Sequence, residues 1–373
     1  MSNSPLEHPL FLPRARLNDL FQSLLDHGYR IMAPVVRDDS ILYQQINSAD
    51  ALPHGIIDDR HNGSYQIAQA KTPRCFAWSN PQQSLKSFVF SPVEILWKSF
   101  YKDNELVFQA IKAEAQPTVI FGVKGCDIAG LQLLDQHFYH KKTPDTHYQQ
   151  RRDNLILFGI NCFRSGSQCF CTNTGDGPNI SSPSDCIMSE LDEGYIIHHV
   201  NSPLTEIIDT LQLKLATTAQ QQQATYESSQ AALSQQQKLP EITANSVFEQ
   251  WSHPVWNDIA DTCLGCGNCT TVCPSCFCHQ ESSDVSIDLT ESSQTRSWDS
   301  CFTTQHSYLH GFYIRPERSQ RYRQWLSHKF SGWQSQFGRI GCTGCGRCAT
   351  YCPVGIDPTQ VLQTLFKRRG EPA

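Results

Sequence analysis

Six of the seventeen cysteines lie within sixteen residues, CLGCGNCTTVCPSCFC, at positions 263 to 278. Thiols at this density can form disulfides, bind zinc or hold an iron–sulfur cluster. Two stretches, 263–273 and 342–352, share the spacing CxxCxxCxxxC followed by proline. Their cysteines are Cys263, Cys266, Cys269 and Cys273 in the first, and Cys342, Cys345, Cys348 and Cys352 in the second. This is the spacing of bacterial ferredoxins, so the sequence predicts two [4Fe–4S] clusters with iron bound through these cysteines.

In each motif, three cysteines lie close together and the fourth is carried away by the turn that ends in proline. In two-cluster ferredoxins this fourth cysteine ligates the other cluster. We therefore expect crossed ligation, with cluster 1 held by Cys263, Cys266, Cys269 and Cys352, and cluster 2 by Cys342, Cys345, Cys348 and Cys273. Zinc is the alternative, but zinc sites usually pair two CxxC arms across a spacer.

A second group of cysteines lies in the N-terminal half. Cys126 and Cys162 come just after two apolar runs, TVIFGV at 118–123 and LILFGI at 155–160. If these runs are neighbouring parallel strands, their carboxyl ends share one edge of a sheet, where ligand sites form in α/β proteins. Cys169 and Cys171 follow shortly after. We predict a possible third [4Fe–4S] cluster held by Cys126, Cys162, Cys169 and Cys171, and the alternative is four buried thiols.

The remaining cysteines and the histidines receive no ligand role. For Cys276, Cys278 and Cys301, a place beside the clusters or in the core is favoured over ligation of a further metal. Cys75 and Cys186 are interpreted as core thiols. A structural role is also the commoner outcome for the histidines considered, which are His198, His199, His306, His310 and His328.

Composition narrows the functional classes. The chain has 373 residues, 39% of them hydrophobic, which is enough to form a core and two or three domains. Its net charge of −6 provides no basic field for nucleic acid or an anionic membrane. No apolar run is long enough to span a bilayer, and the first thirty residues lack a secretory signal. We expect a cytoplasmic protein whose cysteines are not a disulfide framework.

We expect an α+β multidomain protein, in which an N-terminal α/β domain positions the N-terminal cysteines and a mainly helical C-terminal domain positions the two motifs. Residues 1–210 are predicted to form an α/β domain, with a hairpin near residues 30 to 46, a parallel strand–helix–strand unit over 118–160 and a strand at 195–200. Residues 211–245, rich in Gln, Ser and Ala, are predicted to form a linker or exposed helix.

Residues 246–373 are predicted to form a mainly helical, ferredoxin-like domain with two [4Fe–4S] clusters. Aromatic stripes precede both motifs and are interpreted as core: Phe248, Trp251, Val255 and Ile259 before the first, and Tyr322, Trp325, Lys329 and Trp333 before the second. A basic run comprises Arg315, Arg318, Arg321, Arg323 and Lys329. It is interpreted as a solvated helix face, and the alternatives are a docking surface for an acidic partner and electrostatic compensation of the anionic clusters. The two motifs are separated by 68 residues. This separation and the expected helices resemble the all-α ferredoxin module of succinate dehydrogenase iron–sulfur subunits.

Several segments together resemble a known family. They are CLGCGNCTTVCPSCFC, TRSWDSCF, HKFSGW and GCTGCGRCATYCPVGID, with GVKGCD, CFCTNTGDGP and SLKSFVFSPVEIL in the N-terminal half. They resemble the beta (iron–sulfur) subunits of soluble nickel–iron sulfhydrogenases and the iron–sulfur A subunit of anaerobic sulfite reductase. The resemblance implies an electron-transfer subunit between a flavin- and NAD(P)-binding reductase subunit and a catalytic subunit, either a nickel–iron hydrogenase or a sirohaem sulfite reductase.

Three functional hypotheses follow. The first is a non-catalytic electron-transfer subunit, which fits a sequence with no dinucleotide, P-loop or nucleophile-elbow motif. Within it, a hydrogenase partner is preferred and a sulfite reductase partner is the alternative. The second is a catalytic subunit acting on sulfur compounds at an open-site cluster. The third, a redox-sensing regulator, is disfavoured because no DNA-binding helix pair or basic patch is found.

Overall fold

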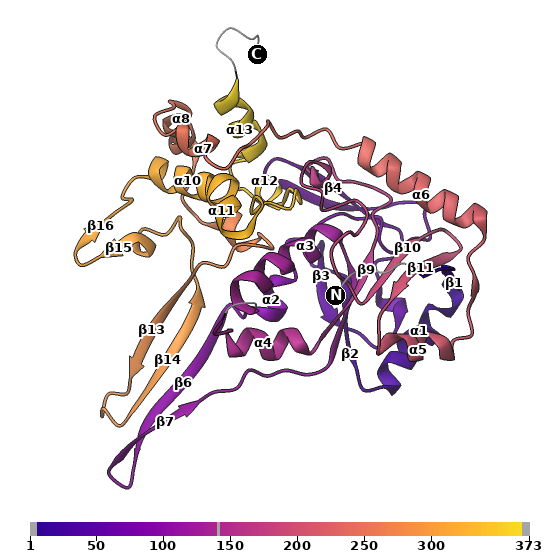
Figure 1. The fold of residues 1–373 in the computed structure, drawn as a ribbon, viewed down its shortest axis with the longest axis horizontal. Coiled ribbons are helices and arrows are strands. Elements are labelled where there is room, and N and C mark those ends of the chain that lie inside the picture. The colour runs from indigo at the N-terminus through magenta and orange to yellow at the C-terminus, as the bar shows by residue number, and fades with distance from the viewer. Residues whose placement is uncertain (1–5, 140–141, 368–373) are drawn as a thin grey trace.

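A mixed eight-stranded sheet forms the centre of the N-terminal part. The computed structural model describes residues 6–139 and 142–367, so the outer ends of the predicted segments, residues 1–5 and 368–373, lie outside it. The strand order is β12-β1-β11-β10-β9-β8-β2-β3, and Figure 1 labels β1, β2, β3, β9, β10 and β11 of this sheet. In chain order the strands are β1 (Leu10–Pro13), β2 (Arg30–Arg37), β3 (Ser40–Gln45), β8 (Thr118–Val123), β9 (Leu155–Ile160), β10 (Cys186–Glu190), β11 (Gly194–Val200) and β12 (Lys214–Leu215).

The middle of this sheet is parallel. Strand β8 pairs in parallel with β2 on one side and with β9 on the other, and β9 pairs in parallel with β10. All six residues of β8 are buried, which explains why its sequence is a continuous apolar run without alternation. The predicted strand–helix–strand unit is therefore confirmed, with α3 (Gly125–Leu134) as its helix. The predicted hairpin is confirmed as β2 and β3, and the strand at 195–200 as part of β11.

Helices cover both faces of the sheet. On one face, α1 (Leu17–Asp26) and α5 (Leu204–Thr210) contribute Phe21 and Ile208 to a core that includes Val119 and Phe121 of β8. On the other face, α2 (Lys86–Val89) packs with both α3 and α4 (Thr146–Asp153), and Ile128 joins a core with Ile120 of β8. Residues that alternate along β8 thus point into two separate cores.

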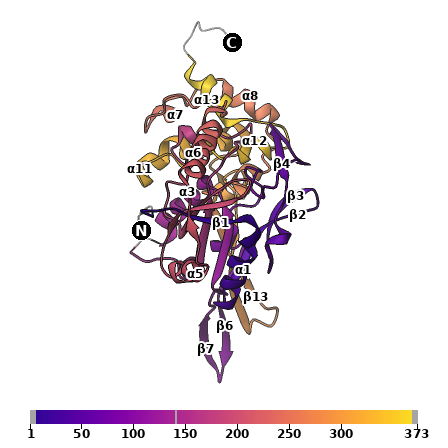
Figure 2. The ribbon, with the colours of Figure 1, turned by 90° about the vertical axis from the view of Figure 1, so that its right-hand side faces the viewer.

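A second, four-stranded antiparallel sheet projects from the body of the molecule, as Figures 1 and 2 both show. Its order is β13-β14-β6-β7, with β6 (Val93–Lys102), β7 (Glu105–Ala110), β13 (His279–Val285) and β14 (Glu291–Trp298). We call it the projecting sheet. The hairpin β13–β14 lies between the two cysteine motifs and pairs with β6 of the N-terminal half, where Glu291 lies opposite Phe100. The fold is therefore α+β with a large mixed sheet, and a mainly helical C-terminal domain is not confirmed.

Short helices surround the two cysteine motifs. They are α7 (Ser246–Glu249), α8 (Val255–Thr262), α9 (Asn268–Thr271), α10 (Arg318–Ser327), a π-helical turn (His328–Gly332), α11 (Trp333–Phe337), α12 (Arg347–Thr350) and α13 (Pro358–Phe366). Tyr322, Trp325 and Trp333 are buried, as predicted. Trp251, however, is 50% exposed, and its ring stacks on the Arg323 guanidinium at 3.5 Å, so the first aromatic stripe is interrupted.

The Gln/Ser/Ala-rich segment contains helix α6 (Thr218–Leu233), which begins with a capping box between Thr217 and Gln220. Its small residues lie against the body, and Ser228 donates a hydrogen bond to Asn179 at 2.5 Å. The remaining strands form two hairpins, β4 (Ile56–His61) with β5 (Ser64–Gln69), and β15 (Tyr308–Leu309) with β16 (Phe312–Tyr313). Among the described residues, no helix has the length and apolar character needed to cross a membrane.

Candidate iron–sulfur centres

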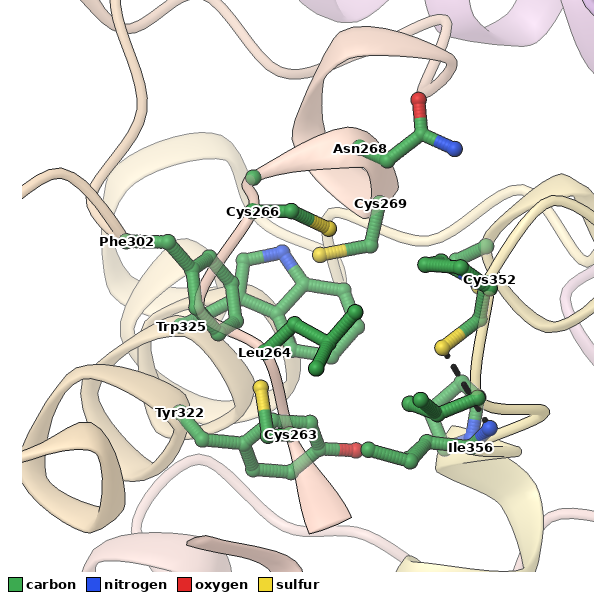
Figure 3. Close-up of a pocket in the computed structure, with 15 residues that line it drawn as sticks. Cys263, Leu264, Cys266, Asn268, Cys269, Phe302, Tyr322, Trp325, Cys352 and Ile356 are labelled. Carbon is green, nitrogen blue, oxygen red and sulfur yellow. Dashed lines mark hydrogen bonds between the residues drawn. The ribbon is translucent and has the colours of Figure 1, made fainter.

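The four cysteines predicted for cluster 1 line one cavity, the first cavity (Figure 3). Cys263, Cys266 and Cys269 come from the first motif and Cys352 from the second, and Cys348 also reaches this cavity. Its walls are apolar and aromatic, and include Phe302, Tyr322 and Trp325. The left-handed conformation of Gly267, with φ of 74°, turns the chain into α9, which carries Cys269.

Backbone amides already point at sulfur in the first cavity. The Gly265 amide donates to Cys263 Sγ at 3.4 Å, and the Ile356 amide donates to Cys352 Sγ at 3.4 Å (Figure 3). Burial raises the pKa of the Cys269 thiol well above its ordinary value. A thiolate at such a position is costly unless a bound cation neutralises it, so the donor set and its burial fit a cluster with iron.

The four cysteines predicted for cluster 2 line an adjacent second cavity. They are Cys273, Cys342, Cys345 and Cys348. Cys269 reaches both cavities, as Cys348 does, so the two cavities are neighbours. The Gly344 amide donates to Cys342 Sγ at 3.4 Å, which repeats the contact made by Gly265 in the first motif. The structure thus places the fourth cysteine of each motif with the three leading cysteines of the other.

A buried lysine lies beside the second cavity. Lys329 is 5% exposed, and its Nζ donates to Ser275 Oγ at 3.0 Å and to Cys276 Sγ at 3.5 Å. Burial disfavours its charge, but the neighbouring sulfurs, with Cys273 first among them, raise the pKa of Lys329 above its ordinary value. The interpretation of the basic run as a solvated face is therefore wrong at Lys329, and also at Arg321, which is 7% exposed.

The four N-terminal cysteines are also brought together; we call them the N-terminal cysteine site. Cys126 lies in the first turn of α3, just after β8, and Cys162 follows β9, so both lie at the carboxyl edge of the parallel strands. Cys126 and Cys171 share a buried cluster with Cys345 of the second motif. Cys162 lies near enough to Cys169 and Cys171 for electrostatic interaction.

Polar side chains contact these sulfurs at close range. Asn80 accepts a hydrogen bond from Cys126 Sγ at 3.2 Å, and its amide nitrogen lies 3.9 Å from Cys169 Sγ. Gln235, which follows α6, donates to Cys171 Sγ at 3.1 Å. Burial raises the pKa of Cys126 and of Cys171, as it does in the two motif cavities. A thiolate at these positions is therefore costly unless a bound cation neutralises it, and the amide groups of Asn80 and Gln235 are the polar contacts that such a group would have.

Three buried cations surround the N-terminal cysteine site. Arg60, Lys124 and Arg347 are each 1% exposed or less. Arg60 Nη1 lies 3.6 Å from Cys169 Sγ, and Lys124 Nζ donates to the Phe76 carbonyl at 3.1 Å. Arg347 is already paired with the buried Asp127 carboxylate, and a thiolate-bound cluster would add negative charge near all three cations. Sequence reasoning missed these cations, although Lys124 lies two residues before Cys126 and Arg347 immediately precedes Cys348.

The second motif packs directly on the N-terminal cysteine site. A Cβ at Gly344 would lie 2.5 Å from Cys171 Cα, and one at Gly346 would clash with the Gln168 carbonyl oxygen. The Phe170 amide donates to the Gly344 carbonyl at 2.8 Å. The three sets of cysteines therefore form a series, in which the second cavity lies between the first cavity and the N-terminal cysteine site.

Single-ion sites are not found. Within residues 6–139 and 142–367, no three His, Cys, Asp or Glu side chains are grouped as ligands of one metal ion. Thiolates that hold a cubane bind different iron atoms, so they surround a space instead of meeting at one point. Cys75 and Cys186 are fully buried in the core of the large sheet.

Comparison with known proteins agrees with this architecture. A family described as a 4Fe-4S dicluster domain matches residues 262–356. Fold and site together thus define an iron–sulfur protein of the 4Fe–4S dicluster class. The chain is 30% identical over 318 residues to sulfhydrogenase 2 subunit beta of Pyrococcus furiosus, which covers 82% of this chain and 90% of that protein. It belongs to the family of sulfhydrogenase beta subunits, and no solved structure matches it.

Proposed function

We propose that this chain is the electron-transfer subunit of an oxidoreductase complex and carries three [4Fe–4S] clusters. Cluster 1 is assigned to Cys263, Cys266, Cys269 and Cys352, cluster 2 to Cys342, Cys345, Cys348 and Cys273, and cluster 3 to Cys126, Cys162, Cys169 and Cys171. The electrons pass between a flavin- and NAD(P)-binding subunit and a catalytic subunit of the nickel–iron hydrogenase type. We place the protein in the cytoplasm.

The observation that carries the proposal is the serial contact of the three sets of cysteines. The two cavities share Cys269 and Cys348, and the second motif contacts the backbone of the N-terminal cysteine site through Gly344. An electron relay requires adjacent redox centres that connect one side of the protein to another, and three clusters at these sites would form such a series. Cys266 is exposed, so the first cavity lies near the surface, where a partner can approach.

The buried charges support the same role. Lys329 lies beside the second cavity, and Arg60, Lys124 and Arg347 lie around the N-terminal cysteine site. Positive charges and amide donors near cluster sulfurs favour the reduced, more negative state and so raise the reduction potential. The protein's own residues thus act by binding iron, by excluding water and by setting the potential of each cluster.

Iron analysis tests the number and place of the clusters. Anaerobically purified protein is expected to contain about twelve iron atoms per chain, four for each cluster. Serine substitution at all four positions of the N-terminal cysteine site is expected to remove about four of them, and the single Cys171→Ser variant tests the same site with less disturbance. Cys186→Ser is the control, because Cys186 is buried away from the three sites. Unchanged iron in both test variants would refute cluster 3.

Activity measurements test the relay. The isolated chain is expected to be reduced by dithionite, with loss of its brown absorbance, and to be reoxidised by a viologen dye. It is expected to reduce neither sulfite nor NAD(P)⁺ without partner subunits. Sulfite reduction by the isolated chain would refute a pure relay toward hydrogenase, and a colourless, iron-free protein would refute the whole proposal.

A further inference from the structure

Helix α6 and the short segment after it, residues 234–239, contact the loop between β9 and β10, and we call them the lid. In the loop, Ser165 Oγ donates to the Ala231 carbonyl of α6 at 2.9 Å. Near the other end of the loop, Asn179 Oδ1 accepts a hydrogen bond from Ser228 Oγ of α6 at 2.5 Å. Figure 1 shows α6 on the outside of the molecule, with an extended segment leading from it to α7. The loop carries three of the four residues of the N-terminal cysteine site, which are Cys162, Cys169 and Cys171.

One buried glutamine joins the lid to this loop. Gln235 is 3% exposed. Its amide oxygen accepts hydrogen bonds from the Thr172 backbone N–H at 3.1 Å and from the Thr172 hydroxyl at 2.9 Å. Its amide nitrogen donates to Ser165 Oγ at 3.1 Å and to Cys171 Sγ at 3.1 Å. Both lone pairs and both N–H groups of this side chain are therefore directed at the loop, and all four hydrogen bonds break when the lid moves away.

Two further polar contacts hold the lid on either side of Gln235. Within α6, the Glu227 carboxylate accepts two hydrogen bonds from the Arg74 guanidinium, at 2.6 Å and 2.9 Å. After the helix, the Leu239 backbone amide donates to Asn173 Oδ1 of the loop at 3.1 Å. The lid is therefore attached along its length by hydrogen bonds and one ion pair.

Apolar packing contributes little to this attachment. Of the sixteen residues of α6, the buried ones are Ala224, Ser228 and Ala231, all of them small. The larger apolar side chains point away from the body, since Tyr226 is 64% exposed and Leu233 is 79% exposed. In α3, by contrast, nine of ten residues are buried. Since hydrophobic stabilisation scales with the apolar area removed from water, the lid should open at a lower free energy than the helices of the core.

We propose that the lid opens as one unit, and that this opening is the route by which iron and sulfide reach the N-terminal cysteine site and by which iron leaves it. With the lid closed, Cys169 and Cys171 are only 5% and 7% exposed, so the folded chain has to move before they can be reached. Gln235 holds the lid closed, and its N–H group contacts the sulfur of one of the proposed ligands. The inference rests on the proposed function for the presence of cluster 3.

Hydrogen exchange of the anaerobically purified full-length chain, followed by mass spectrometry, tests the opening without reference to iron. The amides of α6 are expected to exchange as one group and at least about a hundredfold faster than those of α3. Gln235→Ala should speed exchange in α6 at least about tenfold and leave α3 unchanged, because four hydrogen bonds are lost. Gln236→Ala is the matched control, since the neighbouring Gln236 is exposed. Equal exchange in the two variants, or exchange in α6 as slow as in α3, would overturn the proposal.

Iron release tests the route. The dithionite-reduced protein is mixed with bathophenanthroline disulfonate, and the coloured ferrous complex is followed with time. In Gln235→Ala, about four of about twelve iron atoms are expected to leave at least about tenfold faster than in wild type, and the others at the wild-type rate. Gln236→Ala should match wild type throughout. Release from Gln235→Ala at the wild-type rate would overturn the route. A total of about eight iron atoms would refute cluster 3, and the exchange experiment would then decide the lid by itself.

A substitution of the same shape separates hydrogen bonding from packing. Gln235→Glu keeps the volume of the side chain but replaces the N–H donors to Ser165 and Cys171 with a carboxylate oxygen. We expect it to speed exchange in α6 and iron release at least about tenfold, as Gln235→Ala does. Wild-type rates in Gln235→Glu would show that the side chain only fills space, and would overturn the role of Gln235 in holding the lid closed.

Discussion

The buried ion pair between the second motif and α3 provides the sharpest test of how the two halves of the protein are joined. Arg347 donates to the Asp127 carboxylate through Nη1 at 2.5 Å and Nη2 at 2.8 Å, and neither side chain is more than 1% exposed. Asp127→Asn removes the negative charge and leaves the guanidinium buried. Breaking such a pair from one side costs about 3–5 kcal/mol.

We expect the loss of stability caused by Asp127→Asn to lie near the lower end of this range. After the substitution, Arg347 Nε still donates to the Pro81 carbonyl at 2.6 Å. Cys126 and Cys345 also lie near enough to interact electrostatically with the guanidinium charge. We therefore expect a loss of about 3 kcal/mol. An unfolding entropy of about 2.1 cal/mol/K per residue gives about 0.8 kcal/mol/K for a chain of this length, so the melting temperature should fall by about 4 °C.

The assay is anaerobic thermal unfolding at one fixed scan rate, followed by circular dichroism, because iron–sulfur proteins often unfold irreversibly. Asp19→Asn is the matched control, since Asp19 pairs with Arg16 at the surface, where an ion pair contributes at most about 1 kcal/mol. The double variant Asp127→Leu with Arg347→Met should recover much of the loss. If Asp127→Asn changes the melting temperature no more than Asp19→Asn does, the inference that this pair joins the two halves is wrong.

Two further substitutions address the packing of the second motif and the root of the projecting sheet. Gly344→Ala should destabilise the protein by about 2–5 kcal/mol, because Gly344 has φ of 65° and the new Cβ would meet the Cys171 backbone, and thermal unfolding measures this loss. Glu94 accepts hydrogen bonds from Arg151 and Arg296, which, against the effect of burial, hold its pKa below the ordinary value. Its stabilising contribution is complete above the unfolded pKa near about 4.3 and is lost as pH falls through the lower folded pKa. Glu94→Gln should therefore lower the melting temperature near neutral pH, and the difference from wild type should narrow below about pH 4.

Each of these predictions has a matched control. Gly338 has a similar φ of 72°, but a Cβ added there would meet no atom within 4 Å, so Gly338→Ala should cost only the backbone strain of about 1–2 kcal/mol. Equal losses at both glycines would exclude a steric contact at Gly344. Glu281 is exposed on β13, and Glu281→Gln should behave like wild type at every pH. A difference for Glu94→Gln that stays constant with pH would exclude the lowered pKa.

Features that depend on a few consecutive residues could be predicted from the sequence. Ligand spacing within each motif depends on a few consecutive residues, so the eight cysteines around the two cavities could be chosen without a structure. The continuous apolar runs at β8 and β9 indicated strands buried on both faces. From that, the convergence of Cys126 and Cys162 followed, because carboxyl ends of neighbouring parallel strands lie together.

Features that depend on distant partners could not be predicted. The strand β14, ESSQTRSW, is polar and lacks a clear alternation, and its partner β6 lies almost 200 residues earlier in the chain. The buried cations were missed for a different reason: lysine and arginine are almost always exposed, so their burial is recognised only once the anionic surroundings are known.

The projecting sheet also has a consequence for synthesis of the chain. Strand β6 is complete at Lys102, but its neighbour β14 begins only at Glu291. At ribosomal rates of about 5–20 residues per second, one edge of β6 has no partner for roughly 10 to 40 s. An unpaired strand edge is a template for association with other chains. The nascent polypeptide is therefore open to association with other chains during this interval, and cells with depleted chaperones are expected to yield less of this protein.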